Sequence, residues 1–306
     1  MDKAIAIFIL LVVLVVGTVL IAPSYIDWNQ YRDQIEAYGE RITGRDVSID
    51  GDIGFVLLPT PALTISDFSV ANSEDASEGP MLSLKRLEMQ AALRPLLMGD
   101  IEITNVRLIN PQIALEILAG NSTNWRFEGA DAARQMPDIE LPSWLSAVAR
   151  ALRLDNISIK DGTLTYIDPA RGVRQLVENL NGNFSAATLK GPFTAQGTAL
   201  LRGVDVGFEW SIADTSRMRA VPVRFNLTFP RSDSEIAFRG FLEEATLFGP
   251  IRGDLSFAGS DAARGLNDLF SLIRGGAVAP PKGQVGKALA QDFRAEADFT
   301  INGRSL

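Results

Sequence analysis

The sequence predicts a mainly β protein: an N-terminal transmembrane helix, then an elongated, curved antiparallel β-sheet that forms a meander or groove, with a few short packing helices. Two observations predict this fold class. A charge-free apolar run opens the chain, and beyond it apolar residues recur at every second position in short stretches separated by Gly, Pro and Asn. Such alternation indicates strands with one buried face, and short separations suit hairpins better than helical crossovers.

Residues 1–23 are expected to anchor the chain in a membrane with a single span. From Ala4 to Ala22 no charged or strongly polar side chain occurs, and a helix rising about 1.5 Å per residue reaches roughly 28 Å here, close to the hydrocarbon thickness. A cleaved signal peptide is the rival interpretation, but the run exceeds the usual apolar core of about 7–15 residues. Leu20 and Pro23 also disfavour cleavage. The short N-terminal flank favours a cytoplasmic N-terminus.

Residues 24–130 are expected to form a helix and a sheet. Asp27 can cap a helix that runs to Ile42 and stops at Gly44, and Gln30 is placed to complete a capping box. Tyr25 and Trp28 are candidates for the membrane interface, where amphipathic rings are enriched; packing in the helix core is the alternative. Strands are expected at these apolar groups: Val47 and Ile49, Leu63 and Ile65, Phe68 and Val70 after a register shift, Leu82 and Leu84, Ile101 and Ile103, and Ile113, Leu115 and Ile117.

Residues 131–153 are expected to form a linker and a short helix from Ser143, and residues 154–306 a second β region. A helical insert is expected near 261–274, and a last strand near Phe293–Ile301. Because the chain breaks off just after that strand, we expect it to be a fragment of something longer. The other strands are expected at these groups: Ile157 and Ile159, Leu164 and Tyr166, Val206 to Ile212, Val223 to Phe229, Ile236 and Phe238, and Leu255 and Phe257.

The residue types present exclude most catalytic chemistry. The chain has no His and no Cys, which removes imidazole bases, thiol nucleophiles and thiolate metal sites. A formal net charge of −8 argues against a nucleic-acid surface, which needs an excess of Lys and Arg. Carboxylate pairs such as Asp50 and Asp52 fall in polar, turn-like stretches, where solvated charge is the default. We therefore expect no enzyme, no catalytic residues, no metal site, no cofactor and no nucleic-acid partner.

The strands of the second β region carry large apolar side chains at alternate positions. Such a face can line a groove, or it can cover a private core as in ordinary antiparallel sheets. The sequence leaves both interpretations open. The candidate groove residues are Val206, Phe208, Trp210, Phe225, Leu227, Phe229, Ile236 and Phe238.

Several segments, taken in their order along the chain, resemble the AsmA family. Each segment is common by itself, but their ordered conjunction over about the first 130 residues is specific. The Thr188–Phe193 segment extends the resemblance into the second half. The segments are the apolar anchor, the Asp27–Ile42 helix, Thr43–Gly51, Pro59–Pro61 leading to Ile65–Phe68, Arg94–Gly99 with Ile101, and the Asn124-Trp125 pair.

The resemblance implies an inner-membrane protein of a bacterium with two membranes, with its bulk in the periplasm and a role in outer-membrane biogenesis. The family is similar at its N-terminus to chorein-like bridge proteins, in which a long curved sheet carries phospholipid along an apolar groove. The implied partners are phospholipid and membrane. The alternative is an assembly or targeting factor that binds outer-membrane proteins through exposed sheet edges. Family members are usually much longer than this chain.

Overall fold

The computed structural model describes residues 10, 11, 14, 25–77, 79–126, 154–186, 191–214, 220–243, 250–274 and 291–301. Within these residues no helix combines the length and the apolar character needed to cross a membrane. The expected anchor, Ala4–Ala22, lies outside them apart from three leucines, and so does the expected linker and helix at 131–153.

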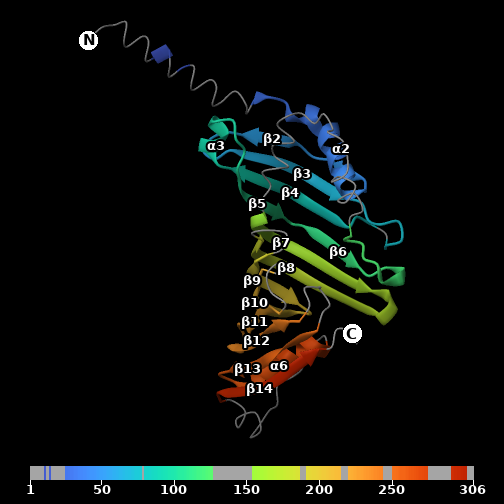
Figure 1. The fold of residues 1–306 in the computed structure, drawn as a ribbon, viewed down its shortest axis with the longest axis vertical. Coiled ribbons are helices and arrows are strands. Elements are labelled where there is room, and N and C mark those ends of the chain that lie inside the picture. The colour runs from blue at the N-terminus through green and yellow to red at the C-terminus, as the bar shows by residue number, and fades with distance from the viewer. Residues whose placement is uncertain are drawn as a thin grey trace, which may run out of the picture. The chain divides into compact units, whose positions relative to one another are not determined.

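The described chain is mainly β, with strands from β2 to β14 and few helices (Figure 1). It divides into two compact units. The first unit contains residues 1–109 and 116–152, and the second contains residues 110–115 and 153–306. In both units the strands pair antiparallel, as predicted.

The first unit opens with a 3-10 helix, η2 (Trp28–Tyr31), which continues into α2 (Arg32–Thr43). Asp27 caps it as predicted, since its carboxylate accepts the Asn29 N–H at 3.0 Å. Gly44 ends α2 with a left-handed backbone, φ 70°, which glycine adopts without strain. Gln30 does not form the expected capping box, in which its side chain would accept the Asp27 N–H. Its side-chain amide instead donates to the Asp27 carbonyl.

The first unit's sheet is built around one nine-residue strand. In β3 (Ala62–Val70) the predicted register shift lies at Asp67, whose backbone is left-handed with φ 48°. This shift allows two short strands to share β3, with Ile53 opposite Ile65 and Ile49 opposite Phe68. The strands are β1 (Val47–Ile49), β2 (Ile53–Val56), β3, β4 (Leu82–Ala91) and β5 (Ile103–Ile109), and β6 (Gln112–Glu116) has residues in both units.

Some elements of the first unit were not predicted. Strand β2 is too short for its alternation to be recognised, and the helix α3 (Leu93–Leu97) contains a proline. Because α3 and the Gly99 turn precede β5, pairing with β4 begins only at Ile103, and the prediction of Ile101 as a strand residue is wrong. Ile117 lies just beyond β6, in an isolated bridge with Thr123 next to η3 (Ala119–Asn121).

The second unit is a meander in which each strand pairs with the next one along the chain, from β7 to β14. The predicted helix and last strand are confirmed as α6 and β14. The two strands expected at Ile157 and Leu164 are one long strand, β7, with register shifts within it. The elements are β7 (Leu154–Asp168), η4 (Pro169–Arg171), β8 (Val173–Ala186), β9 (Phe193–Leu201), β10 (Val204–Ile212), β11 (Val221–Phe229), β12 (Ser234–Leu242), β13 (Ile251–Gly259), α6 (Ala262–Arg274) and β14 (Phe293–Ile301).

Strands β8 and β9 were not predicted, and small residues explain the omission of β9. In β9 the positions that face the core hold Ala195, Gly197 and Ala199. A Cβ on Gly197 would lie 2.9 Å from Cζ of Phe208 and would collide with the Asn181 carbonyl. The close approach of Phe208 therefore requires a glycine, and a glycine weakens the apolar alternation that predicts a strand.

Candidate functional site

All eight candidate groove residues lie on one face of the second unit's sheet. In an antiparallel pair, directly opposite residues point to the same side. Phe208 lies opposite Leu227, and Leu227 lies opposite Ile236. Trp210 lies opposite Phe225, which lies opposite Phe238. Val206 and Phe229 occupy alternate positions on the same strands and complete the set.

This apolar face extends over the neighbouring strands. The register places small residues of β9 beside β10, and aromatic or aliphatic residues of β13 beside β12. These residues were not among the eight candidates, although the apolar alternation in β13 predicts that Leu255 and Phe257 share a face. We call this surface the apolar face; its further members are Ala195, Gly197, Ala199, Leu255, Phe257, Ala295, Ala297 and Phe299.

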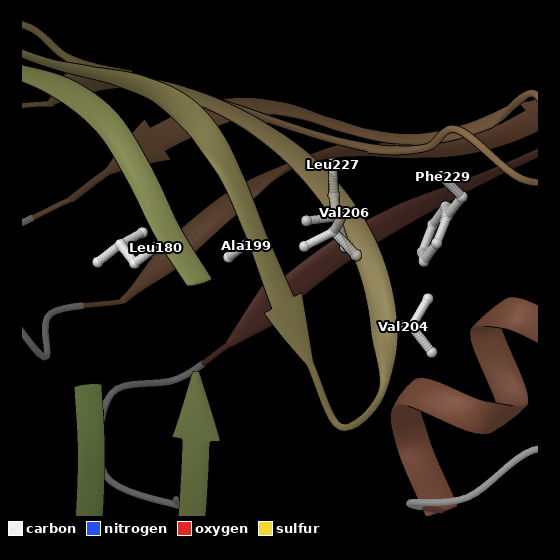
Figure 2. Close-up of a cluster of buried hydrophobic side chains, with 6 residues drawn as sticks. All are labelled: Leu180, Ala199, Val204, Val206, Leu227 and Phe229. Carbon is white, nitrogen blue, oxygen red and sulfur yellow. The ribbon is translucent and has the colours of Figure 1, made fainter. Parts of the chain in front are cut away.

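One end of the apolar face is a closed core, here called the covered end. Val206 and Phe229 are only 3% and 1% exposed there. Figure 2 shows the side chains of this cluster projecting from neighbouring strands, with α6 beside Val204. Leu272 of α6 packs against them. The cluster is Leu180, Ala199, Val204, Val206, Leu227 and Phe229.

Helix α6 reaches the covered end through small residues. Gly265 is buried, and a Cβ there would lie 2.9 Å from Phe293 and 3.2 Å from Phe257. Asp261 caps the start of the helix by accepting the Arg264 N–H at 3.0 Å. At the other end, Arg202 donates to the carbonyls of Leu272 and Ile273 at 2.9 and 2.5 Å. Arg202 lies in the turn between β9 and β10, so this side chain fixes the helix to the sheet.

Farther along the same strands the apolar face is partly exposed, in a band here called the open strip: Trp210, Phe225, Phe238 and Phe299. Phe225 is 36% exposed and Phe299 37%. The rings of Phe238 and Phe299 lie edge to face, 6.1 Å apart. Beyond the strip, the strand ends are closed again at Val221 and Leu242, which are both buried. The face therefore combines a closed core with an exposed aromatic band.

Glycines let aromatic rings lie along the apolar face instead of standing away from it. The Phe208 ring approaches Gly197 and Gly182, and the Phe238 ring approaches Gly240, so closely that a Cβ on any of these glycines would crowd the ring. A flat aromatic surface offers broad van der Waals contact to an apolar molecule.

The two interface candidates occupy different surroundings. Tyr25 is 85% exposed. Trp28 packs in the first unit's core, with its ring 5.3 Å from that of Phe55 and 5.7 Å from that of Tyr31.

The carboxylates form no metal-binding cluster in the part of the chain that the structure describes. No group of three or more acidic residues there could hold a metal ion. Asp50 lies in an exposed turn and accepts the Ser48 hydroxyl at 3.1 Å. Asp168 is buried but is paired with Arg171 at 2.9 Å, next to η4.

Comparison with known proteins gives one match. The family model described as the AsmA family matches residues 1–236, which is more than half of the 306-residue chain. No curated protein and no solved structure matches the chain at a significant level.

Proposed function

The chain belongs to the AsmA family, and from this premise we propose that it carries phospholipid on the apolar face of its second unit. In this proposal it is a protein of outer-membrane biogenesis, anchored in a bacterial inner membrane by residues 1–23, with its bulk in the periplasm. It is not an enzyme, and its partners are phospholipid and membrane.

The observation that carries the proposal is the open strip. An acyl chain that covers exposed apolar surface removes it from water, which is favourable by roughly 25 cal/mol per Å² of buried apolar area. The strip supplies such surface on adjacent strands, with Phe225 and Phe299 each more than a third exposed. It crosses the strands, so an acyl chain lying along it would contact Trp210 and Phe225 in turn.

The apolar face is divided into a buried part, the covered end, and an exposed part, the open strip, and this division supports a binding role for the open strip. The covered end gives the second unit a core of its own, so the exposed band is not needed to complete that core. Exposed aromatic residues gathered in one place typically mark an interaction site. Headgroups can remain in water while acyl chains lie on the strip, which is why lipid carriage needs little specific chemistry.

Site-specific photo-crosslinking tests the proposal with a matched control. The photoreactive amino acid p-benzoylphenylalanine replaces Phe225, on the open strip, or its neighbour Arg224, which is exposed on the opposite face. The full chain is expressed in a bacterial envelope and irradiated, and adducts are identified by mass spectrometry. We expect phospholipid adducts at position 225 and few at position 224. The double change Phe238→Asp and Phe299→Asp should abolish the adducts at 225.

Equal adduct yields at both positions would mean that nearby membrane, and not the apolar face, supplies the lipid. An absence of lipid adducts at position 225 in a chain that circular dichroism shows to be folded would reject lipid carriage.

The alternative function, assembly of outer-membrane proteins through sheet edges, is favoured by β14. Among the described strands of the second unit, β14 is paired only with β13, and residues 294–300 are exposed. An unpaired edge can accept an extended segment of another chain. Crosslinks from Thr300 to outer-membrane proteins, together with lipid-free crosslinking at Phe225, would favour this function over lipid carriage.

A further inference from the structure

The face of the sheet opposite the apolar face is polar. Along each strand, the residues that alternate with the apolar ones point to the other side of the sheet. The register that places Phe208 opposite Leu227 also aligns these residues in rows across the strands. One row is Asn183, Gln196, Glu209 and Asn226, and the next is Asn181, Thr198, Gly207 and Thr228.

These rows line an open hollow of about 600 Å³, here called the polar hollow, to which Ser158 of β7 also contributes. Ile159, Gly182, Gly197 and Phe208, which alternate with the polar residues along these strands, complete its lining. The volume is within the range of about 300–1,000 Å³ that is typical of small-molecule sites. Gly207 keeps the middle of the hollow open, because a Cβ there would collide with the Thr228 hydroxyl.

Two polar atoms in the lining lack hydrogen-bond partners. Oγ of Ser158 and Oδ1 of Asn226 are both buried and unpaired. Buried polar atoms are nearly always hydrogen-bonded, since leaving one unpaired costs about 1–3 kcal/mol. A ligand hydroxyl that reaches either atom would supply the missing hydrogen bond.

The lining selects one class of ligand. Its amides and hydroxyls both donate and accept hydrogen bonds. Glu209 is the one charged side chain among the lining residues, so the hollow repels anions and lacks a cation to bind phosphate. Backbone groups in the strand interior are already paired in the sheet, so an extended peptide cannot add there as a strand.

We propose that the polar hollow binds neutral carbohydrate. Sugar hydroxyls match this lining, whether they belong to a free oligosaccharide or to the sugar headgroup of a lipid. Because the hollow and the open strip lie on opposite faces, this site does not rest on lipid carriage.

Saccharide binding to the full chain tests the proposal. The chain is solubilised in lauryldimethylamine oxide, because maltoside detergents would compete with the ligand. Saturation-transfer NMR and calorimetry are run with maltotriose, chitotriose and cellotriose, and flotation is run with vesicles containing galactosyl diacylglycerol or only phosphatidylglycerol. We expect binding of at least one trisaccharide, or a preference for galactolipid over phosphatidylglycerol vesicles, and we expect Asn226→Leu to weaken either about tenfold. Gln196→Ala serves as a second variant if Asn226→Leu misfolds, and Thr300→Ala, on the same face outside the hollow, serves as the control.

Binding of a soluble trisaccharide would identify a free glycan as the ligand, and a preference for galactolipid over phosphatidylglycerol vesicles without trisaccharide binding would identify a headgroup. The proposal is overturned if the wild-type chain shows neither trisaccharide binding nor that preference. It is also overturned if both are equal in the wild-type chain and the hollow variants. The crosslinking test at position 225 is separate from these measurements, so an absence of phospholipid adducts there would not change the outcome of the saccharide test.

Discussion

A helix covers part of the sheet in each unit, but the two helices are held in different ways. In the first unit, side chains of η2 and α2 bond directly to the backbone of β1, β2 and the turn between them. Glu36 accepts the Ile49 N–H at 2.7 Å, Asn29 accepts the Ile53 N–H at 3.0 Å, and Arg32 donates to the Gly51 carbonyl at 2.8 Å. In the second unit α6 packs by its small residues, and Arg202 of the sheet bonds to its last carbonyls.

The first unit's helix is needed to complete its sheet, whereas α6 covers only part of one face of the second unit's sheet. The first helix completes backbone hydrogen bonds of β1 and β2 and buries its Trp28 and Ile35 against the core, so the first unit's sheet depends on it. Helix α6 buries only the covered end and leaves the open strip exposed.

The largest expected effect on stability is a difference between a substitution at the covered end and one on the open strip. Phe229→Ala should destabilise the second unit by about 3–5 kcal/mol, because a fully buried ring leaves a cavity. Phe225→Ala should cost less than about 1 kcal/mol, because its ring is already partly in water. Urea-dependent hydrogen exchange of β10–β12 peptides measures both values. Similar losses for the two variants would mean that the open strip is ordinary core.

Glu36 should show how far the first unit depends on its helix. Glu36→Ala leaves the Ile49 N–H buried without an acceptor, which should cost about 1–3 kcal/mol. The readout is the free energy of exchange for α2 and β1 peptides. Glu40→Ala is the matched control, since Glu40 lies on the exposed side of α2 and its loss should change stability by less than about 0.5 kcal/mol. Equal effects of the two substitutions would show that the helix is held by packing alone.

The shared face of the eight candidates could be predicted from sequence, because alternation determines which residues of a strand point to the same side. Strands β10, β11 and β12 carry large apolar residues at every second position, and the registers place all eight candidates on one side. The neighbours in β9 were not predicted because Gly197 is needed under the Phe208 ring, and a glycine carries no apolar signal.

The division into a covered end and an open strip could not be predicted from sequence. It depends on where α6 lies, and α6 is held by Arg202, which is 70 residues away from Leu272 along the chain. The sequence of α6 predicts a helix but does not identify its partner. For the same reason the choice between groove and core stayed open, since Phe229 is buried and Phe225 is partly exposed on a single strand.

The smallest expected effect concerns the bonds between Arg202 and α6. Arg202 has a left-handed backbone, φ 51°, so Arg202→Asn is the appropriate change, because Asn tolerates this conformation. Loss of the guanidinium removes charge-assisted bonds to the last carbonyls of α6 and should lower the stability of that helix by about 1–2 kcal/mol. Faster amide exchange in α6, with β9 and β10 unchanged, is the expected result.

Arg231→Ala is the control for this change, because Arg231 forms an exposed ion pair with Asp205 at 2.6 Å, and such pairs contribute less than about 1 kcal/mol. If Arg202→Asn affects exchange in α6 no more than Arg231→Ala does, then close packing at Gly265 and the neighbouring alanines holds the helix without help from the turn. The covered end would then keep its core when the turn is altered, and the contrast with the first unit would lie only in how much of each face is covered.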